Sequence, residues 1–391
     1  MATTYRYISA DSHLEIPAER WAGYIPAEYR DRAPRLVRLP NGADAWLAEG
    51  RPLHINGLNL SAGKPRETIS PIGGQYDASA GTGPPEQRLA EQDQDGIDAE
   101  VLFTGVAGPG LWRGIREDRV YKAVVRAYND YLGREYCAVA PERLIGLGVL
   151  PETGVEDAIA EMAHCKELGL GGVTLNAFPH GKSHPVPEDD RFWSAAVEMG
   201  MPVTVHVEFG FPANNYGGRT GPSFAYPQQP EEGMAGPMDV IPRFAKYGFR
   251  AAFHAVQMVW AGVFDRHPDL RIFFAETQIG WLPNFLEQMD STYARSRYWV
   301  HRHLGLEPLH RKPSEYVLEH CYWGFQYNPM GVRTVVQEIG PDRVMWANDF
   351  PHLESDWPNS MAVIEESFAD VPSEARHRMV AGNAIDFFHL G

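Results

Sequence analysis

Two residues near the N-terminus have the types and the spacing of a metal site. Asp11 and His13 are two positions apart at the end of the apolar run 5–13. On a β-strand, residues i and i+2 point to the same face, so both side chains can reach one ion. A carboxylate with an imidazole suits Zn, Fe, Mn and Co. The alternative is a chance D-x-H in a turn, because the pair alone is a weak signal.

Three more polar side chains stand at the ends of apolar runs. His206 lies in PVTVHV, Glu276 follows RIFFA, and Asp349 follows VMWAN. A carboxylate buried at the end of a strand needs a partner, and a metal ion is the usual one at such a place. His206 taken alone has an alternative interpretation as a core histidine with a hydrogen-bond partner. Together with Asp11 and His13, His206 and Asp349 indicate one metal site far more specifically than any one of them.

The elements that position these residues alternate between short apolar runs and helical periods. The runs span 5–13, 97–105, 143–151, 170–178, 202–210, 271–277, 316–327 and 343–351. Helical spacing occurs over 121–132, 155–162 and 192–199. Strands that alternate with helices predict a parallel sheet. Eight of them predict an α/β fold of the TIM-barrel type, (β/α)8, with active-site residues at the carboxyl ends of the strands. The alternative is an open doubly wound sheet, but no G-x-G-x-x-G follows the first strand.

Three long stretches do not fit this repeat. Residues 19–88 and 211–238 are rich in Pro and Gly and follow the first and fifth strands, so we expect an insertion that forms a lid and an active-site loop. Residues 293–314 carry His301 and His303 among several arginines, which indicates a solvated face or an oligomer contact rather than a ligand pair. The prediction is therefore one barrel domain, 1–391, with long insertions.

From its first strand to the C-terminal GNAIDFFHL, the sequence resembles the amidohydrolase-related family. The resemblance is to the branch that contains aminocarboxymuconate-semialdehyde decarboxylase and the resorcylate-type decarboxylases. The segments that carry it are SADSHLEIP (9–17), TVHV (204–207), GVFDRHPDLRIFFAE (262–276) and WANDFPH (346–352). It implies a distorted (β/α)8 barrel and a homo-oligomer of two or more chains, with a hetero-oligomer as the alternative. It also implies that Asp11, His13, His206 and Asp349 are metal ligands, although many members have His or Glu where Asp11 stands.

The sequence departs from this family at the sixth strand. Many members carry a histidine there that polarises the metal-bound water or protonates the substrate, whereas this chain has Glu276. A glutamate can serve as a base or as a further metal ligand, but it is no cationic acid. With Glu15 and Glu208 close in sequence, the added carboxylates leave a two-metal site as an alternative.

Two further histidines are candidates for proton transfer. His352 follows Asp349 by three residues, within loop reach of the site, and its alternative role is to cap the turn. His254 starts a helical segment that resembles the helix before strand 6 in the decarboxylases, and its alternative is a core position. We expect Asp349, Glu276, His352 and His254 to be catalytic, and Glu276 to join the four metal ligands.

These residues predict a metal-dependent enzyme that hydrolyses or decarboxylates a small organic acid or amide. A divalent metal activates bound water and polarises a carbonyl or carboxylate. Zinc is the first choice, with manganese or iron as alternatives and one or two ions. The first alternative function is a dinuclear Fe/Fe or Mn/Fe oxygenase on the same barrel. The second is a non-catalytic partner subunit with a structural metal, which the scarcity of Cys and His ligands disfavours.

The overall composition excludes several partners. The chain has 35 basic and 51 acidic residues, a formal net charge of −16, so it lacks the basic footprint of a nucleic-acid binder. It gives no support for binding to an anionic membrane, and no apolar run approaches the roughly 18 residues of a membrane span. Three cysteines without C-x-x-C fit a reducing compartment, and the N-terminus lacks the features of a signal peptide. We therefore expect a cytoplasmic enzyme with a small-molecule substrate.

Overall fold

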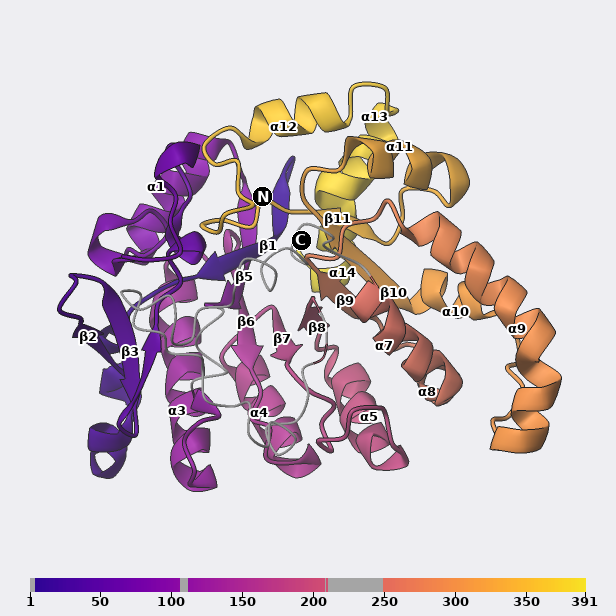
Figure 1. Ribbon diagram of the computed structural model, residues 1–391, viewed down its shortest axis with the longest axis horizontal. Helices are drawn as coiled ribbons and strands as arrows, with labels where there is room; N and C mark the ends of the chain where they lie inside the picture. Colours follow the sequence, from indigo (N-terminus) through magenta and orange to yellow (C-terminus); the bar gives the residue numbers. More distant parts are fainter. Residues whose placement is uncertain (1–3, 106–111, 208, 210–248) are drawn as a thin grey trace.

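The computed structural model describes residues 4–105, 112–207, 209 and 249–391. Eight parallel strands form a nearly closed barrel, and their order around the sheet follows the chain (Figure 1). They are β1 (Ile8–Leu14), β5 (Ala99–Thr104), β6 (Leu144–Val149), β7 (Gly172–Leu175), β8 (Val203–His206), β9 (Ile272–Ala275), β10 (Cys321–Phe325) and β11 (Val344–Trp346). The predicted TIM-barrel fold is confirmed.

Backbone hydrogen bonds join the last strand to the first just beyond the end of β11. The amide of Asp349 donates to the carbonyl of Asp11 at 3.0 Å, and the amide of His13 donates to the carbonyl of Phe350 at 2.7 Å. The two ends of the chain's barrel therefore meet at the carboxyl ends of β1 and β11.

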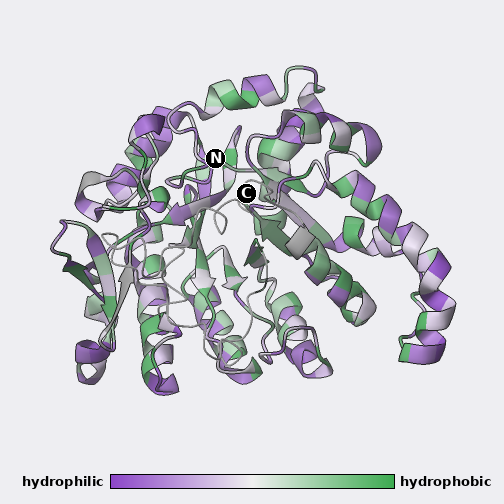
Figure 2. Cartoon of the chain, in the orientation of Figure 1, coloured by the Kyte–Doolittle hydropathy of each residue, from purple (hydrophilic) through white to green (hydrophobic). Residues whose placement is uncertain are grey.

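Helices surround the strands, as Figure 1 shows. They are α1 (Pro85–Asp95), α3 (Asp118–Tyr131), α4 (Val155–Glu167), α5 (Asp190–Met199), α7 (Phe249–Trp260), α8 (Val263–Arg266), α9 (Leu282–Leu304), α10 (Pro313–His320), α11 (Pro329–Glu338), α12 (Ser360–Ser367), α13 (Ser373–His377) and α14 (Asn383–Phe388). The predicted spacing holds on α3, where Tyr121, Val124, Val125 and Tyr128 are all buried. In Figure 2 the helices show hydrophobic and hydrophilic residues in alternating bands, as expected when one face of each helix packs against the barrel. None of the described helices is both long and apolar enough to cross a membrane.

The amino-terminal end of the barrel is plugged by the C-terminal helix. Phe387 and Phe388 of α14 join a buried cluster with Ile8 and Ala99, the first residues of β1 and β5. The ring of Phe387 also lies 4.8 Å from that of Tyr322. Because this end is filled with apolar side chains, a polar site can open only at the carboxyl ends of the strands.

The insertion 19–88 has secondary structure of its own. It contains an antiparallel sheet of β2 (Arg35–Arg38), β3 (Asp44–Ala48) and β4 (Arg51–His54), separate from the barrel. It is attached to the loop after β11, because the amides of Ser61 and Ala62 both donate to the carbonyl of Pro351 at 3.1 Å. A role as a lid stays a prediction, and the predicted active-site loop 211–238 lies outside the described residues.

Two sequence predictions about secondary structure were wrong. In the predicted strand 316–327, the first five residues complete α10, and the strand begins only at Cys321. A short apolar run cannot distinguish a buried strand from a buried helix turn, and here Pro313 in the first helical turn favours the helix. The stretch 293–314 is helical as far as Leu304, where Gly305 ends α9 with φ +69°.

Candidate metal centre

The four residues predicted as metal ligands come together at the barrel mouth. Asp11 and His13 lie on β1, His206 is the last residue of β8, and Asp349 follows β11. The Nε2 atom of His13 lies 3.6 Å from Oδ1 of Asp11 and 3.3 Å from Oδ1 of Asp349. The Nε2 atom of His206 lies 3.6 Å from Oδ2 of Asp11. One ligand atom each of Asp11, His13 and His206 lies within 4.8 Å of the other two, which is close enough for the three residues to bind a single metal ion.

The tautomer of His13 suits a metal at this place. Its Nδ1 atom lies 3.1 Å from the carbonyl oxygen of Thr104, which can only accept a hydrogen bond. Nδ1 therefore carries the proton and Nε2 presents its lone pair toward the two carboxylates. Such an outer hydrogen bond is how proteins orient a ligating histidine.

The surroundings of the Asp11 and Asp349 carboxylates show that a cation fits between these side chains. Both side chains are fully buried, and within the described part of the chain none of their four oxygens meets a donor in good hydrogen-bond geometry, although ring nitrogens of His13 and His352 each lie 3.3 Å from Oδ1 of Asp349. Burial, together with the charges of Asp349 and Glu276, raises the pKa of Asp11 well above its ordinary value. Burial also acts to raise the pKa of Asp349, but the imidazoles of His352 and His13 hold it below its ordinary range. Buried charges of this kind need compensation, and a divalent cation supplies it.

Strained backbone is concentrated around this centre. Val207, Glu276 and Asp349 have φ values of 60°, 55° and 52°. Non-glycine residues in this left-handed region cost on the order of 1 kcal/mol each and cluster at functional sites. The amide of Val207 is held by the carbonyl of Ala275 at 3.1 Å, and that of Asp349 by Asp11.

Carboxylates extend the centre on one side. The Oε2 atom of Glu276 lies 3.5 Å from Nε2 of His206, so the predicted fifth ligand is within reach of the cluster. Glu276, Asp349 and Glu354 form a second group whose ligand atoms all lie within 4.8 Å of one another. Sequence reasoning missed Glu354, although its place two residues after His352 was a usable signal.

His352 also belongs to the site. Its Nδ1 lies 3.3 Å from Oδ1 of Asp349, and its Nε2 lies 3.1 Å from Oε1 of Glu15. The ring stacks on that of His13, with centroids 3.8 Å apart and 16° between the planes. Burial acts to lower the pKa of His352, but the carboxylates of Asp349 and Glu15 outweigh it and raise that pKa well above the ordinary value. Glu15, placed by the sequence only near the site, is thus the partner of His352.

Comparison with known proteins now identifies the family. Residues 10–390 match the family model described as Amidohydrolase. The chain belongs to the amidohydrolase family. The resemblance inferred from the sequence is therefore confirmed.

Within the amidohydrolase family, the chain is similar to characterised decarboxylases. It is 25% identical over 298 residues to gamma-resorcylate decarboxylase of Rhizobium sp. (strain MTP-10005), covering 72% of this chain and 82% of that protein. It is 23% identical over 308 residues to 2-amino-3-carboxymuconate-6-semialdehyde decarboxylase of Dictyostelium discoideum, covering 78% and 77%. A solved structure of a dihydroxybenzoic acid decarboxylase from Polaromonas sp. JS666, with bound manganese and the inhibitor 2-nitroresorcinol, shares the fold. Its TM-score is 0.61 at 20% identity, over 99% of this chain and 98% of that one.

Arg88 holds the backbone of this amidohydrolase site through hydrogen bonds to the carbonyls of His13 and Phe350. This role was not predicted from the sequence. The Arg88 side chain is buried and donates from Nε to Glu100 at 2.6 Å, from Nη1 to the carbonyl of His13 at 3.0 Å, and from Nη2 to the carbonyl of Phe350 at 3.4 Å. The guanidinium also lies 4.5 Å from the centre of the Phe350 ring. Arg88 therefore fixes the strand ends that carry His13 and Asp349.

The remaining predicted residues lie elsewhere or are not described. His254 is on α7, where Nδ1 pairs with Gln257 Oε1 at 3.0 Å and the ring packs against Phe209 at 5.3 Å. It is not a member of the metal-binding groups found among the described residues, so its catalytic role stays a prediction. His301 is exposed, with its Nδ1 3.2 Å from the carbonyl of Leu306. Glu208 lies outside the described residues.

Proposed function

We propose that this protein is a metal-dependent carboxy-lyase that removes CO2 from a small aromatic acid. The observation that carries the proposal is the cluster of Asp11, His13, His206 and Asp349, in which the two carboxylates are fully buried and meet no donor in good hydrogen-bond geometry among the described residues. The decarboxylases similar to this chain support the reaction type, and 2-nitroresorcinol bound to the Polaromonas protein supports an aromatic substrate.

Asp11, His13, His206 and Asp349 would hold the metal, with Glu276 as an added ligand or base. A divalent ion there supplies a positive charge that binds and polarises the carboxylate of the substrate. Zinc was the choice from the sequence, and the manganese in the Polaromonas structure makes manganese an equal candidate.

The residues of the chain would manage the proton. When the carboxyl group leaves as CO2, the electron pair of the broken C–C bond stays on the ring carbon and must receive a proton. His352 is placed to deliver it from Nδ1, because Glu15 holds the far side of the ring at 3.1 Å and Asp349 lies beside the near side. Glu276, next to His206, is placed to accept a proton from the substrate.

The test combines metal analysis with a decarboxylation assay. Purified protein is analysed for metals and incubated with 2,6-dihydroxybenzoate and related hydroxybenzoates, with CO2 release measured in air and without oxygen. We expect about one divalent ion per chain and CO2 release that is independent of oxygen. Chelation should abolish release, and Mn²⁺ or Zn²⁺ should restore it. A protein that hydrolyses amides or lactones but releases no CO2 from any of these acids contradicts the proposal.

The second group of carboxylates favours one alternative. Glu276 and Glu354 lie within ligand distance of Asp349, and bridging carboxylates are typical of two-metal sites. The alternative is the dinuclear Fe/Fe or Mn/Fe oxygenase. It predicts two ions per chain, at least one of them iron, and substrate-dependent oxygen uptake.

A further inference from the structure

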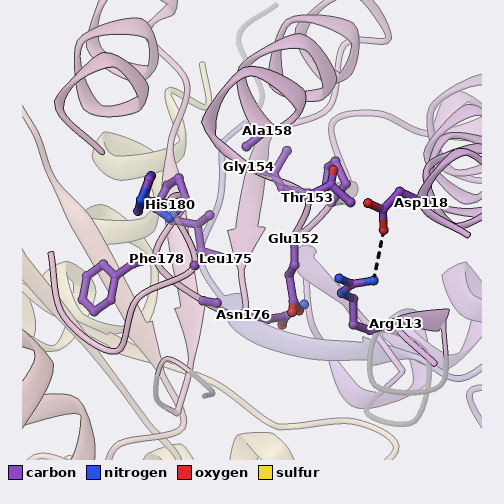
Figure 3. Close-up of a pocket in the computed structure, with 15 residues that line it drawn as sticks. Arg113, Asp118, Glu152, Thr153, Gly154, Ala158, Leu175, Asn176, Phe178 and His180 are labelled. Carbon is purple, nitrogen blue, oxygen red and sulfur yellow. Dashed lines mark ion pairs between the residues drawn. The ribbon is translucent and has the colours of Figure 1, made fainter. Parts of the chain in front are cut away.

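A polar cavity lies at the carboxyl ends of β6 and β7. Its volume is about 200 Å³, and its walls include Arg113, Glu152, Asn176, Leu175 and Phe178 (Figure 3). Drug-sized ligands occupy pockets of roughly 300–1,000 Å³, so this cavity suits one end of a small molecule rather than a whole one.

The strand register places this cavity next to the metal centre. Leu175 of β7 pairs with Val205 of β8, so the residues that follow them, Asn176 and His206, lie level on adjacent strands. Neighbouring strands are about 4.8 Å apart. The separation between Asn176 and His206 is therefore short enough for an aromatic acid held at the metal centre to reach Asn176.

Two donors of the cavity wall are buried and still have room for a ligand. Among the described residues, Nε of Arg113 makes no hydrogen bond, and Nδ2 of Asn176 meets no acceptor in good geometry, although Asn176 lies close enough to Glu152 to lower the pKa of that carboxyl group. Arg113 is held in place by Asp118, 3.5 Å from Nη1, and by the ring of Tyr121, 5.0 Å from the guanidinium carbon. Leaving a buried donor unsatisfied costs about 1–3 kcal/mol, which a bound ligand would recover.

Charge decides which ligand group fits. Arg113, Asp118, Glu152 and His180 are the titratable side chains in the cavity wall, and with His180 neutral and the other three ionised their charges sum to −1. A second anionic group is therefore disfavoured. A hydroxyl group can accept two hydrogen bonds and donate one, which matches the donors of Arg113 and Asn176 and the carboxyl group of Glu152. Burial raises the pKa of Glu152. Protonation of this carboxyl group at low pH removes one negative charge from the cavity and still leaves an oxygen that can accept a hydrogen bond from the hydroxyl group.

We propose that Arg113, Asn176 and Glu152 form a subsite that binds a hydroxyl group of the substrate and so selects hydroxylated aromatic acids. The proposal deepens the proposed function, because it requires the carboxylate of the substrate to be held at the metal centre. Leu175 and Phe178 supply the apolar wall for the ring that carries the hydroxyl group.

Resorcinol, which has hydroxyl groups but no carboxylate, tests the subsite without turnover. Its binding to the metal-loaded protein is titrated by NMR for the wild type, Asn176→Leu and Arg113→Lys. Arg113→Lys keeps a positive charge near Asp118 but removes the Nε donor. We expect resorcinol binding to weaken about tenfold in each variant, the upper range for one buried hydrogen bond.

Arg119→Lys is the matched control, since Arg119 lies on the same part of the chain but its side chain is 70% exposed. It should bind resorcinol as the wild type does. Thermal melting and metal content show whether each variant is folded and loaded. Equal binding to the wild type and both cavity variants overturns the subsite, and so does a wild type that does not bind resorcinol.

Catalysis gives a second and separate readout. The cavity variants should raise KM for 2,6-dihydroxybenzoate and leave unchanged the inhibition constant of unsubstituted benzoate, a competitive inhibitor that lacks the hydroxyl groups. A failure of the proposed function appears instead as no CO2 release from any aromatic acid, whatever the resorcinol titration shows.

Discussion

The Nη1 atom of Arg88 donates a hydrogen bond to the carbonyl oxygen of His13 at 3.0 Å. The same guanidinium pairs with Glu100 in a fully buried ion pair, with side chains 1% and 2% exposed. Arg88 therefore has two roles. It neutralises the buried carboxylate of Glu100, and it fixes the position of the backbone at His13, a candidate metal ligand.

Replacing Arg88 should therefore impair both stability and metal binding. Arg88→Met leaves Glu100 as a buried charge without its partner, which costs about 3–5 kcal/mol of unfolding free energy. Loss of an outer contact to a ligating residue lowers metal affinity roughly 10- to 100-fold. Urea unfolding and a metal titration measure the two effects. Arg6→Met, which removes an exposed pair with Asp98, is the control and should change neither by much.

Removing a ligand should empty the metal centre without unfolding the chain. His13→Ala, His206→Ala and Asp349→Asn are each expected to lose most of the bound metal, because each takes away one donor of a compact set. Elemental analysis after dialysis gives the stoichiometry. The exposed His301→Ala should keep the full amount. If His206→Ala retains one ion per chain with unchanged affinity, the ligand assignment is wrong.

Glu15→Gln should slow catalysis while the metal stays bound. Glu15 contacts His352 rather than the ligand cluster, at 3.1 Å, and an amide no longer stabilises the imidazolium form of that ring. We expect kcat to fall about 10- to 100-fold, the range typical for loss of an outer partner that orients a functional histidine, with KM little changed. Steady-state kinetics on metal-replete protein measure this. Glu28→Gln, an exposed carboxylate of the insertion, is the comparison that should leave kcat unchanged.

A glycine-to-alanine substitution, which adds one methyl group, tests whether the close packing between the insertion and the loop after β11 matters for stability and activity. A Cβ added at Gly81 would lie 2.6 Å from Cγ of Pro351, and Gly81 has φ +76°. At Gly73, with φ +83°, an added Cβ meets nothing within 4 Å among the described residues. Both Gly→Ala changes carry the backbone penalty of about 1 kcal/mol, but Gly81→Ala adds the clash.

We therefore expect Gly81→Ala to lower the melting temperature more than Gly73→Ala does, and to reduce activity as well. Differential scanning calorimetry and the CO2 assay supply the comparison. Equal effects of the two substitutions would show that this packing contact does not matter to the site.

Much of the fold and part of the site were predictable from the sequence. Asp11, His13, His206 and Asp349 end apolar runs, and the carboxyl ends of parallel strands meet on one face of a barrel, so the pattern alone brought them together. The start of the strand at Cys321 was placed five residues too early, because Tyr316, Val317 and Leu318 form a short apolar run that fits a strand or a helix turn equally well, and the helix signal at Pro313 was not used.

Other parts depend on contacts that no local pattern reveals. Arg88 lies 75 positions from His13, and Glu15 lies 337 positions from His352. Their residue types are common, and nothing in the neighbouring sequence distinguishes them from surface charges. The buried donors of Arg113 and Asn176 could be recognised as a binding site only once the cavity around them was known.

The attachment of the insertion to the loop after β11 has a consequence for protein engineering. The amides of Ser61 and Ala62 and the guanidinium of Arg66 hold the carbonyls of Pro351 and Leu353, which flank His352. A chimera that takes only one of these segments from a relative would leave mismatched surfaces next to the centre. Exchange of specificity between family members should therefore succeed only when both segments, about 290 residues apart in the chain, are transplanted as a pair.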